Sequence, residues 1–423
     1  MDHNQSNIAS PNRNIKKAYF IVFVCMIMQA IPFGVAQNIQ PLFIPYVTSK
    51  FDFSLASFSL IFTFGAIASA ICSPFLGKLY GKVNIKFLFL IGVILSSLGF
   101  MGFSFARKLY QFDILSAVSQ VGCIMFSGLG VPFIISHWFP NNGKGKALGI
   151  AFSGGSIGNV FLQPITSHLL AASGPSTSYI IFGLLSLIVG IPLVIFFIRL
   201  PRDQEVISPS NTSNAQENTT IKGYEGAGAE AVRKNIYFWL FSIGYAIIAI
   251  PIAALSTQYA TYFKSALNLQ PSLIGILGST FALFCLLGNV VGGTLFDKLG
   301  SLKTMAISAI LIIIAIISLL LSAHFHYISF LFSISYGLNV YSYMSGPAFM
   351  SSDVFGRKES SVTLGTISLL FALGFAFGSS LFGLIVDHFQ FTVAWITMLI
   401  CVVIGYALLL ISIMKYKKQT LHT

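Results

Sequence analysis

Gly77-Lys-Leu-Tyr-Gly81-Lys82-Val-Asn84-Ile-Lys86 is a short glycine and lysine-rich link between two long apolar runs. A second link, Gly293-Thr-Leu-Phe-Asp297-Lys298-Leu-Gly300-Ser-Leu-Lys303, follows 216 residues later in a chain of 423. The same offset aligns further identical residues, namely Phe139 with Phe355, Leu148 with Leu364, Gly149 with Gly365 and Gly158 with Gly374. A fixed offset shared by distant matches indicates an internal duplication. Two homologous membrane halves with a site between them are a common plan of secondary transporters.

The composition excludes a water-soluble protein. Hydrophobic residues make up 55% of the chain, charged residues only 9%, and the mean hydropathy is +0.83, which is too apolar for a soluble surface. Apolar runs of about 20 residues, the length that a helix needs to cross hydrocarbon, recur along the whole chain. Long runs such as Ile307 to Leu321 contradict the short alternating segments of a barrel, so helices must span the membrane.

We therefore predict an all-α membrane protein with twelve transmembrane helices in two homologous six-helix bundles. The predicted spans of the first half are 18–39, 54–77, 87–106, 114–136, 147–170 and 178–198. Those of the second half are 236–263, 271–296, 304–323, 327–350, 360–386 and 390–414. The chain then divides into a cytoplasmic N-terminal tail (1–17), a first bundle (18–200), a cytoplasmic linker (201–235), a second bundle (236–414) and a cytoplasmic C-terminal tail (415–423). Glu230 to Lys234 predicts a short surface helix before the second bundle.

Lysine and arginine are unevenly distributed between the loops. With both termini in the cytoplasm, 20 of the 24 basic residues fall in cytoplasmic segments, and only Lys50, Arg107, Lys108 and Lys264 fall outside. An excess of basic residues in cytoplasmic loops fixes the orientation of a membrane protein. The net charge of +12 is thus a topology signal and not a nucleic-acid-binding surface. We expect a multi-pass monomer of the cytoplasmic (inner or cell) membrane of a bacterium, in contact with membrane lipids and with no nucleic acid partner.

Chemistry other than transport finds little support. The five cysteines occur singly in apolar runs, without metal-ligand or redox spacing, and we interpret them as small core residues. They are Cys25, Cys72, Cys123, Cys285 and Cys401. Because no acid pair, histidine cluster, nucleophile motif or phosphate-binding loop occurs within the spans, we expect no catalytic residues, no metal and no cofactor. An enzyme is therefore disfavoured, whereas a channel would be distinguished by flux that does not saturate.

Taken together, these features resemble the major facilitator superfamily over essentially the whole chain. The second link is similar to the superfamily's loop signature after its second and eighth helices. The first link departs from it, because Gly81 takes the place of the acid and Asn84 that of the following glycine. The resemblance implies that Asp297 holds the eighth helix to the start of the eleventh in one access state. The gating residues implied are Gly77, Gly81, Lys82, Gly293, Asp297 and Lys298.

A finer resemblance rests on two stretches. Trp138-Phe139 with Gly145-Lys-Ala-Leu-Gly149-Ile-Ala-x-Ser-Gly154-Gly-Ser-Ile-Gly158 resembles the oxalate/formate antiporter and monocarboxylate porter group, as does Glu230-Ala-Val-Arg233. The group's eighth helix commonly carries an arginine for the substrate's carboxylate, and oxalate carriers add a lysine in the eleventh. Asn289 takes the arginine's place here, and 362–386 contains no lysine. The resemblance implies an organic anion, whereas these departures favour a larger or less charged compound.

None of the twelve predicted spans contains Asp, Glu, Lys or Arg. Since an intramembrane charge normally marks a transport site, recognition has to rest on neutral polar and aromatic side chains. Tyr336, Asn339 and Tyr343 have the spacing of one helical face. The candidate substrate-binding residues are Gln29, Gln37, Gln120, Asn159, Gln163, Tyr245, Gln258, Tyr262, Asn289, Tyr336, Asn339 and Tyr343. Their alternative role is hydrogen bonding between helices without a ligand.

The sequence predicts a secondary active transporter that moves a small organic solute by alternating access. The expected solute is an organic anion such as a monocarboxylate, and the alternative is a facilitator or exporter of a larger amphipathic or neutral compound. Asp113, Asp353 and Asp387 lie only at helix ends, and we interpret His168 as a packed or interfacial residue. Antiport or facilitated exchange is therefore favoured over proton symport. The 41 Phe and 16 Tyr favour a cavity with aromatic walls.

Overall fold

The structure is a computed structural model that describes residues 11–139, 143–202, 229–356 and 360–420. Within these ranges the chain is helical almost throughout, and extended backbone pairs only at an isolated bridge between Tyr80 and Val83. Nine helices of the described part are long and apolar enough to cross a membrane. Two of the nine are pairs of predicted spans that continue across a glycine, and the predicted tenth span is divided into shorter helices. The twelve-helix fold is thereby confirmed.

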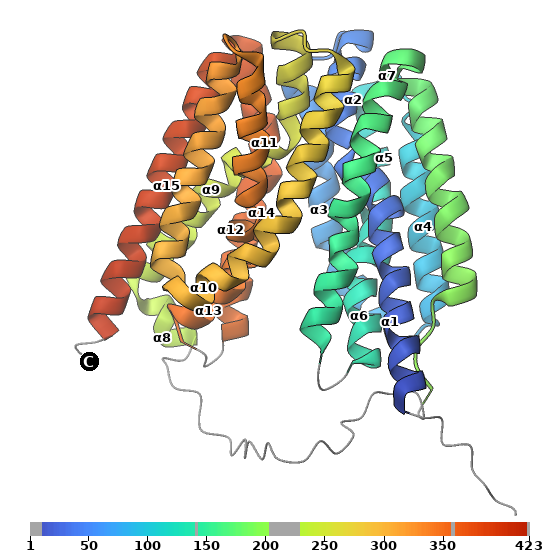
Figure 1. Cartoon of the computed structure of the whole chain (residues 1–423), viewed down its shortest axis with the longest axis horizontal. Helices are drawn as coiled ribbons and strands as arrows, with labels where there is room; N and C mark the ends of the chain where they lie inside the picture. The colour runs from blue at the N-terminus through green and yellow to red at the C-terminus, as the bar shows by residue number, and fades with distance from the viewer. Residues whose placement is uncertain (1–10, 140–142, 203–228, 357–359, 421–423) are drawn as a thin grey trace, which may run out of the picture. The chain divides into compact units, whose positions relative to one another are not determined.

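The first half contains α1 to α7, drawn from blue to green in Figure 1. These elements are α1 (Pro11–Met28), the π-helix η1 (Gln29–Asn38), α2 (Gln40–Phe51), α3 (Leu55–Leu79), α4 (Ile85–Gly102), α5 (Leu109–Cys123), η2 (Ile124–Gly130), α6 (Val131–Trp138) and α7 (Lys144–Phe197). The second half contains α8 (Ala229–Lys234), α9 (Ile236–Thr261), η4 (Tyr262–Ala266), α10 (Pro271–Ser322), η5 (His326–Ile328), α11 (Ser329–Leu338), α12 (Tyr341–Met344), α13 (Gly346–Asp353), α14 (Ser360–His388) and α15 (Phe391–Thr420).

Two glycines reverse the chain inside α7 and α10. Gly174 has φ 73° and ψ 176°, and Gly300 has φ 71° and ψ 172°. A side chain would be strained at these positive φ angles, whereas glycine adopts them readily. Each of the two long helices is therefore a pair of spans joined by a one-residue turn, at the places where the hydropathy predicted loops.

The predicted tenth span, 327–350, is not one helix. It consists of η5, α11, α12 and α13, with breaks around Asn339 and Ser345 (Figure 1). Pro347 stands in the first turn of α13, where its missing N–H is tolerated, whereas inside a continuous helix it would remove a hydrogen bond. This break changes which side chains share a face.

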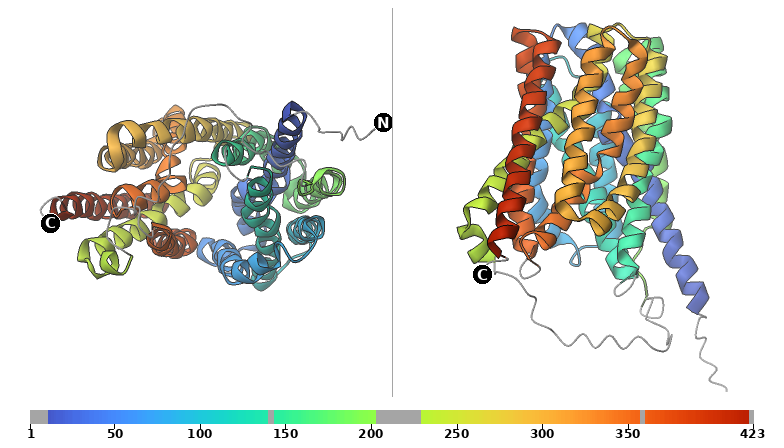
Figure 2. Two further views of the ribbon diagram at one scale, coloured as in Figure 1. Left: turned by 90° about the horizontal axis from the view of Figure 1, so that it is seen from below. Right: turned by 60° about the vertical axis from the view of Figure 1, so that its left-hand side comes forward.

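The chain divides into two compact units that do not follow the sequence halves. The first unit comprises 1–39, 67–162 and 176–217, and the second comprises 40–66, 163–175 and 218–423. Trp138, Phe89 and Phe126 are completely buried in the core of the first unit. In the second unit α14 and α15 both pack along α9, as the end-on view of Figure 2 shows. The second unit thus contains two segments from the first half of the sequence.

The internal duplication reappears in the contacts. A Cβ atom on Gly158 would lie 2.1 Å from the carbonyl oxygen of Ala30, and one on Gly374 would lie 2.1 Å from that of Ala246. Both glycines and both alanines are separated by the offset of 216. In the same way the rings of Tyr80 and Phe133 have centroids 5.1 Å apart, and those of Phe296 and Phe349 4.9 Å apart. The two halves therefore repeat packing as well as sequence.

The helices extend beyond the predicted spans at both ends of the chain. The first helix begins at Pro11, inside the predicted tail 1–17, and the last continues to Thr420, inside the predicted tail 415–423. Polar residues can continue a helix into the headgroup region, where hydropathy no longer marks it. The predicted surface helix at 230–234 is confirmed as α8. Most of the predicted linker, 203–228, lies outside the described residues.

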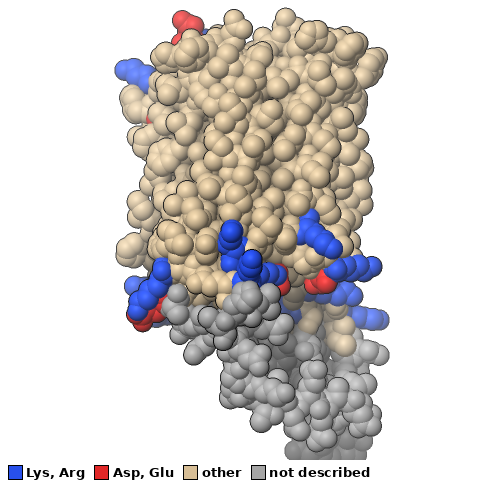
Figure 3. All heavy atoms as spheres, turned by 90° about the vertical axis from the view of Figure 1, so that its left-hand side faces the viewer, with Lys and Arg blue, Asp and Glu red and all other residues tan. Residues whose placement is uncertain are grey.

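Charged side chains avoid the middle of the helices. On the face drawn in Figure 3, lysine and arginine atoms form a band near one end, and the surface between the two ends is uncharged. The helix ends joined by the links Gly77 to Lys86 and Gly293 to Lys303 are called the link end below, and the opposite ends are called the distal end. The arrangement of charges fits a chain whose middle faces hydrocarbon.

Candidate functional site

The first unit pairs several of the candidate amides. Gln37 Nε2 donates to Gln120 Oε1 at 2.7 Å, which joins η1 to α5. Ser127 Oγ donates to Gln29 Oε1 at 2.9 Å, and Gln29 is completely buried. Gln37 and Gln120 stay half-buried, so this pair, unlike Gln29, keeps part of its surface accessible. Asn159 on α7 is buried as well.

The second unit contains a buried polar cluster at the distal end. Gln258 Nε2 donates to Ser59 Oγ and to Ser379 Oγ, both at 2.8 Å. Tyr259, the next residue on α9, donates its hydroxyl to Gln163 Oε1 at 2.9 Å. The cluster therefore joins α3 and α7, which come from the first half of the sequence, to α9 and α14 of the second half.

Three candidate amides each have one side-chain donor or acceptor without a hydrogen-bond partner in the described part of the chain. Gln29 Nε2, Gln258 Oε1 and Asn339 Nδ2 are buried and have no hydrogen-bond partner among the described residues. A buried polar atom without a partner costs about 1–3 kcal/mol. A water molecule or a polar atom of a solute would relieve that cost.

Aromatic side chains of the second unit form two groups. The Tyr336 ring is stacked with Phe281, at a centroid distance of 5.1 Å with an interplanar angle of 8°, and with Tyr343, at 6.5 Å and 23°. The Tyr245 and Phe371 rings have centroids 4.9 Å apart and are tilted by 36°. Tyr336 and Tyr245 are completely buried. Phe281, Tyr343 and Phe371 are half-buried, so each group combines a buried tyrosine with at least one partly exposed ring.

Hydrogen bonds hold the two buried tyrosines in place. The Tyr336 hydroxyl lies 2.5 Å from Ser256 Oγ and donates to the carbonyl oxygen of Ile252 at 2.9 Å. The Tyr245 hydroxyl donates to the carbonyl oxygen of Ser342 at 2.6 Å. Because both hydroxyls are satisfied within the protein, these two residues offer a solute their rings and not their hydroxyls.

Two candidates serve the packing of the helices instead. Of the predicted common face of Tyr336, Asn339 and Tyr343, the two tyrosines lie together with ring centroids 6.5 Å apart, whereas α11 ends just before Asn339. Asn339 Oδ1 accepts from Ser308 Oγ at 2.5 Å, and that hydroxyl also lies 2.6 Å from the Tyr406 hydroxyl. Tyr262 donates to the carbonyl oxygen of Leu319 at 3.0 Å. Asn289, in contrast, is exposed on α10.

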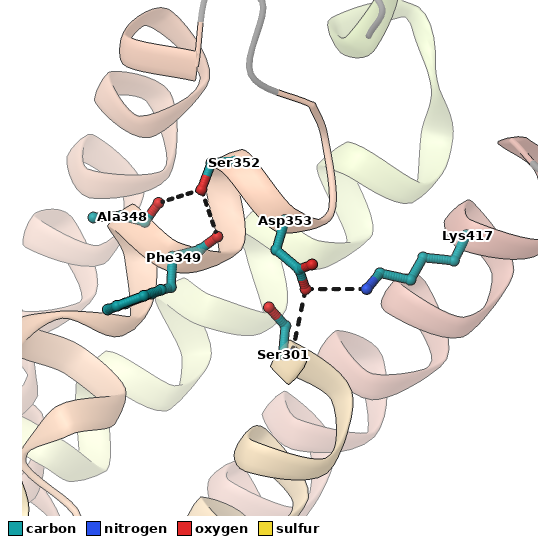
Figure 4. A network of polar contacts seen from close by, with 6 residues as sticks. All are labelled: Ser301, Ala348, Phe349, Ser352, Asp353 and Lys417. Atoms are coloured by element: carbon teal, nitrogen blue, oxygen red, sulfur yellow. Dashed lines mark hydrogen bonds and ion pairs between the residues drawn. The ribbon is translucent and has the colours of Figure 1, made fainter. Parts of the chain in front are cut away.

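The two links differ in how the helix that follows is capped. Asn84 Oδ1 accepts from the backbone N–H of Lys86 at 3.0 Å, so the first link caps its own helix. In the second link Gly300 takes the position of Asn84, and glycine has no side chain that could cap the following helix. Asp353 Oδ2 accepts from the backbone N–H of Ser301 at 3.3 Å instead (Figure 4). A carboxylate at a helix N-terminus is stabilising because exposed N–H groups concentrate positive potential there.

Asp353 also binds Lys417 at the end of α15, with Nζ 3.0 Å from Oδ2 (Figure 4). Partial burial alone would raise the pKa of Asp353. The hydrogen bonds from Ser301 and Lys417 and the charge of Lys417 outweigh burial, so the pKa of Asp353 lies below its usual value. The expected gating acid, Asp297, is exposed and makes no hydrogen bond or ion pair with the described residues. The sequence placed Asp353 at a helix end but did not indicate its partner, because Ser301 lies 52 residues earlier.

A third carboxylate acts at the distal end. Asp387, at the end of α14, accepts the backbone N–H of Leu55 on Oδ1 at 2.9 Å and that of Ala56 on Oδ2 at 2.8 Å. About two turns along α3, Thr63 Oγ1 donates to the carbonyl oxygen of Ala376 at 2.5 Å. Sequence reasoning placed Asp387 at a helix end but assigned it no partner. Among the described residues no group of three His, Cys, Asp or Glu side chains lies close enough to hold a metal.

The chain matches the family model of the Major Facilitator Superfamily over residues 19–263 and 241–421. It is 24% identical over 261 residues to the MFS-type transporter YcxA of Bacillus subtilis, a match that covers 60% of this chain and 59% of the relative. It is 25% identical to the riboflavin transporter RibZ of Clostridioides difficile, over 80% of this chain and 82% of the relative. Among solved structures, the nucleoside transporter NupG superposes with a TM-score of 0.71 at 17% identity, covering 92% of this chain and 98% of that one. A bacterial homolog of the human lysosomal transporter Spinster gives a TM-score of 0.71 at 16% identity, covering 95% and 98%.

Proposed function

This chain belongs to the Major Facilitator Superfamily, and from that premise we propose that it is a secondary active transporter for a flat, uncharged or amphipathic aromatic compound. Transport proceeds by alternating access, in which the two bundles rock around a site near the middle of the membrane. The relatives named above are transporters. Both termini lie in the cytoplasm in this proposal, and the link end is the cytoplasmic end.

The observation that carries the proposal is the two groups of aromatic rings, in a chain whose predicted spans contain no charged residue. Phe281, Tyr343 and Phe371 present partly open rings backed by buried tyrosines. Offset stacking on such rings contributes about 0.5–1.5 kcal/mol per pair beyond the area buried. Gln258 Oε1 of the same unit, which is buried without a hydrogen-bond partner among the residues described, adds direction to binding. A compact, fully charged anion would gain little from this set of groups.

The second unit contains two segments from the first half of the sequence, and this supports the movement that alternating access requires. Residues 40–66 and 163–175 pack with the second half through Ser59, Thr63 and Gln163. In the opposite access state these distal segments dissociate from α9 and α14. The polar contacts are hydrogen bonds, each of which contributes about 0.5–1.5 kcal/mol, so a bound solute is able to shift the balance between states.

The second candidate function is exchange of organic anions such as monocarboxylates. It is favoured by the stretch from Trp138 to Gly158 and by Glu230-Ala-Val-Arg233, which resemble the oxalate/formate antiporter and monocarboxylate porter group. The absence of basic residues from the predicted spans opposes it. Under either candidate we propose a monomer that works by antiport or facilitated exchange, since the spans contain no carboxylate to carry a proton.

A thermal-shift screen of the purified protein separates the candidates. We expect flat neutral or amphipathic aromatic compounds to raise Tm and aliphatic monocarboxylates to leave it unchanged, because a ligand stabilises the folded state in proportion to its binding. Compounds that bind are then tested in proteoliposomes, where a carrier shows saturable uptake that is stimulated by the same compound on the other side. Stabilisation by aliphatic carboxylates alone would establish the second candidate, and flux that does not saturate would rule out a carrier.

A further inference from the structure

A basic pocket lies at the link end of the first unit. It has a volume of about 360 Å³ and is lined by Lys16, Lys17, Phe20, Ile21, Phe196, Phe197 and Arg199. These residues come from the beginning of α1 and from the end of α7 with Arg199 just beyond it. Three of the seven carry a positive charge, and none of the described residues that line the pocket carries a carboxylate. From this pocket we infer a binding site for the headgroup of an anionic phospholipid in the cytoplasmic leaflet.

The pocket is prepared for a phosphate group. Arg199 is half-buried, and its guanidinium lies 5.1 Å from the centre of the Trp138 ring. Trp138 Nε1 also donates to the backbone oxygen of Arg199 at 3.1 Å, and Trp138 is completely buried. A guanidinium held in this way loses less conformational freedom on binding a phosphate, which it grips with two parallel hydrogen bonds. Lys86 Nζ donates to the carbonyl oxygen of Ile195 at 2.8 Å and holds the end of α7.

The apolar part of the pocket lining could contact the acyl chains of a lipid. Phe20 and Phe196 are exposed by 48% and 73%, and Phe20 packs edge-on against Phe197 with a centroid distance of 5.4 Å. Exposed phenyl rings beside clustered cations are the arrangement that an interfacial lipid requires, with its headgroup on the charges and its chains on the rings. Anionic lipids of the cytoplasmic leaflet are attracted by basic residues close to the membrane surface. Charge and apolar surface together favour a lipid over a free anion.

The duplication provides an internal comparison. A second pocket is lined by Lys234, Asn235, Ile236, Tyr237 and Gln419, and Ile236 and Tyr237 are the counterparts of Phe20 and Ile21 at the offset of 216. Lys234 Nζ lies 2.8 Å from Glu230 Oε1. Asn235 Nδ2 donates to Gln419 Oε1 at 2.9 Å. The second pocket thus occupies a duplicated position with one basic side chain in its lining, where the first has three.

The test uses the purified full-length protein in detergent, titrated with dioleoyl phosphatidylglycerol and followed by Tm and by native mass spectrometry. Dioleoyl phosphatidylcholine and inorganic phosphate are the comparison probes. We expect saturable binding of phosphatidylglycerol that weakens at high salt, with little effect of the other two. Since a basic residue near an anionic surface contributes a factor of about five, Lys16→Gln/Lys17→Gln should weaken binding about 25-fold. Arg199→Gln should weaken it about fivefold, and Arg199→Lys less.

Lys234→Gln in the second pocket is the matched control and should leave the affinity unchanged. The double lysine variant changes only residues at the surface of the pocket, so it tests the site even if Arg199→Gln lowers Tm by itself. Equal binding of phosphatidylcholine, full affinity in the double lysine variant, or an equal loss in Lys234→Gln would overturn the site. If inorganic phosphate alone gives the same stabilisation, the pocket is a small-anion site and the assignment to a lipid is wrong.

Discussion

The carboxylate of Asp387 accepts the backbone N–H of Leu55 at 2.9 Å, across 332 residues of sequence. Its other oxygen accepts the N–H of Ala56 at 2.8 Å, so one side chain at the end of α14 caps the first turn of α3. The duplicated position, 216 residues earlier, is Ala171, which cannot cap the helix that begins at Pro271. The distal end therefore has a carboxylate latch between α14 and α3 and no counterpart of it between α7 and α10.

Removing this latch should open the distal end. Asp387→Ala removes a cap, and the loss of a cap costs about 1 kcal/mol, which corresponds to roughly a fivefold shift toward the state open at that end. The reporter is Ser59→Cys, at a completely buried position, in a background without the native cysteines. Its labelling by a membrane-impermeant maleimide from outside should become about fivefold faster. Asp387→Asn keeps an acceptor and should have a smaller effect.

The matched control for the latch is Asp52→Asn. Asp52 is an exposed acid at the same end with φ 55°, an angle that asparagine tolerates. The Asp52→Asn substitution removes one negative charge, as Asp387→Ala does, but leaves the cap on α3 intact. The labelling rate should therefore not change. If Asp387→Ala labels no faster than Asp52→Asn, the contact to Leu55 does not hold the distal end closed.

Tyr343→Ala should weaken the binding of an aromatic solute about tenfold and change Tm little. Tyr343 is a half-buried ring stacked at the front of Tyr336, so its loss removes a contact with the solute and not a buried part of the core. Tyr262→Ala is the comparison, because Tyr262 is buried and its hydroxyl is bonded to Leu319. That variant should lower Tm and leave affinity unchanged. The opposite pattern, measured by ligand-dependent thermal shift, would remove Tyr343 from the site.

Asn289→Arg should create affinity for carboxylates. Asn289 stands where the carboxylate-binding arginine of the organic anion group is expected, and it is exposed on α10. A guanidinium there would offer two hydrogen bonds to a carboxylate, and we expect about a tenfold gain in affinity for monocarboxylates. Asn289→Gln keeps the amide without the charge and should show no gain. Unchanged affinity of the arginine variant for a panel of acids would place Asn289 away from the substrate.

The ion pair of Asp353 and Lys417 should make stability depend on pH. Because the pKa of Asp353 is lowered in the folded protein, the contribution is complete above the unfolded-state pKa of about 4. It is lost as the pH falls through the lower folded-state pKa. Asp353 is partly exposed, so the contribution should be at most about 1 kcal/mol. Wild type should have a higher Tm than Asp353→Asn at pH 6, and the difference should shrink below about pH 4.

Lys417→Gln is the matched control for the pair. It removes the charge of the partner but leaves the cap on Ser301, so it should reduce Tm less than Asp353→Asn does. A difference between wild type and Asp353→Asn that stays constant from pH 6 to pH 3 would show that the carboxylate does not act through its charge.

The parts of the fold that were predictable are those encoded locally or by repetition. The lengths of the apolar runs predicted the membrane spans. Gly300 lies in the second link, where the chain reverses at a φ angle that glycine adopts readily. The caps were not predictable, because nothing near Leu55 or Ser301 in the sequence points to Asp387 or Asp353. Asn339 was misplaced for a related reason. Its spacing from Tyr336 assumed an unbroken helix, whereas α11 ends at Leu338 and Asn339 accepts a hydrogen bond from Ser308.

The duplicated glycines provide the sharpest test of the shared architecture. Gly158 and Gly374 each face a carbonyl oxygen, of Ala30 and Ala246, that a Cβ atom would approach to 2.1 Å. Such an approach requires the helices to move apart, and overpacking of this kind costs about 1–3 kcal/mol. Gly158→Ala and Gly374→Ala should therefore each lower Tm, and by similar amounts because the contact is repeated.

Gly149→Ala and Gly365→Ala are the controls, since they lie at the same offset on the same helices and a Cβ there meets nothing within 4 Å. Alanine is the better helix former, so these two should be neutral or slightly stabilising. Equal effects at all four positions would mean that helix propensity and not close packing decides them. Loss at Gly158 alone would mean that the second half tolerates a separation of α9 and α14 that the first half does not tolerate between η1 and α7.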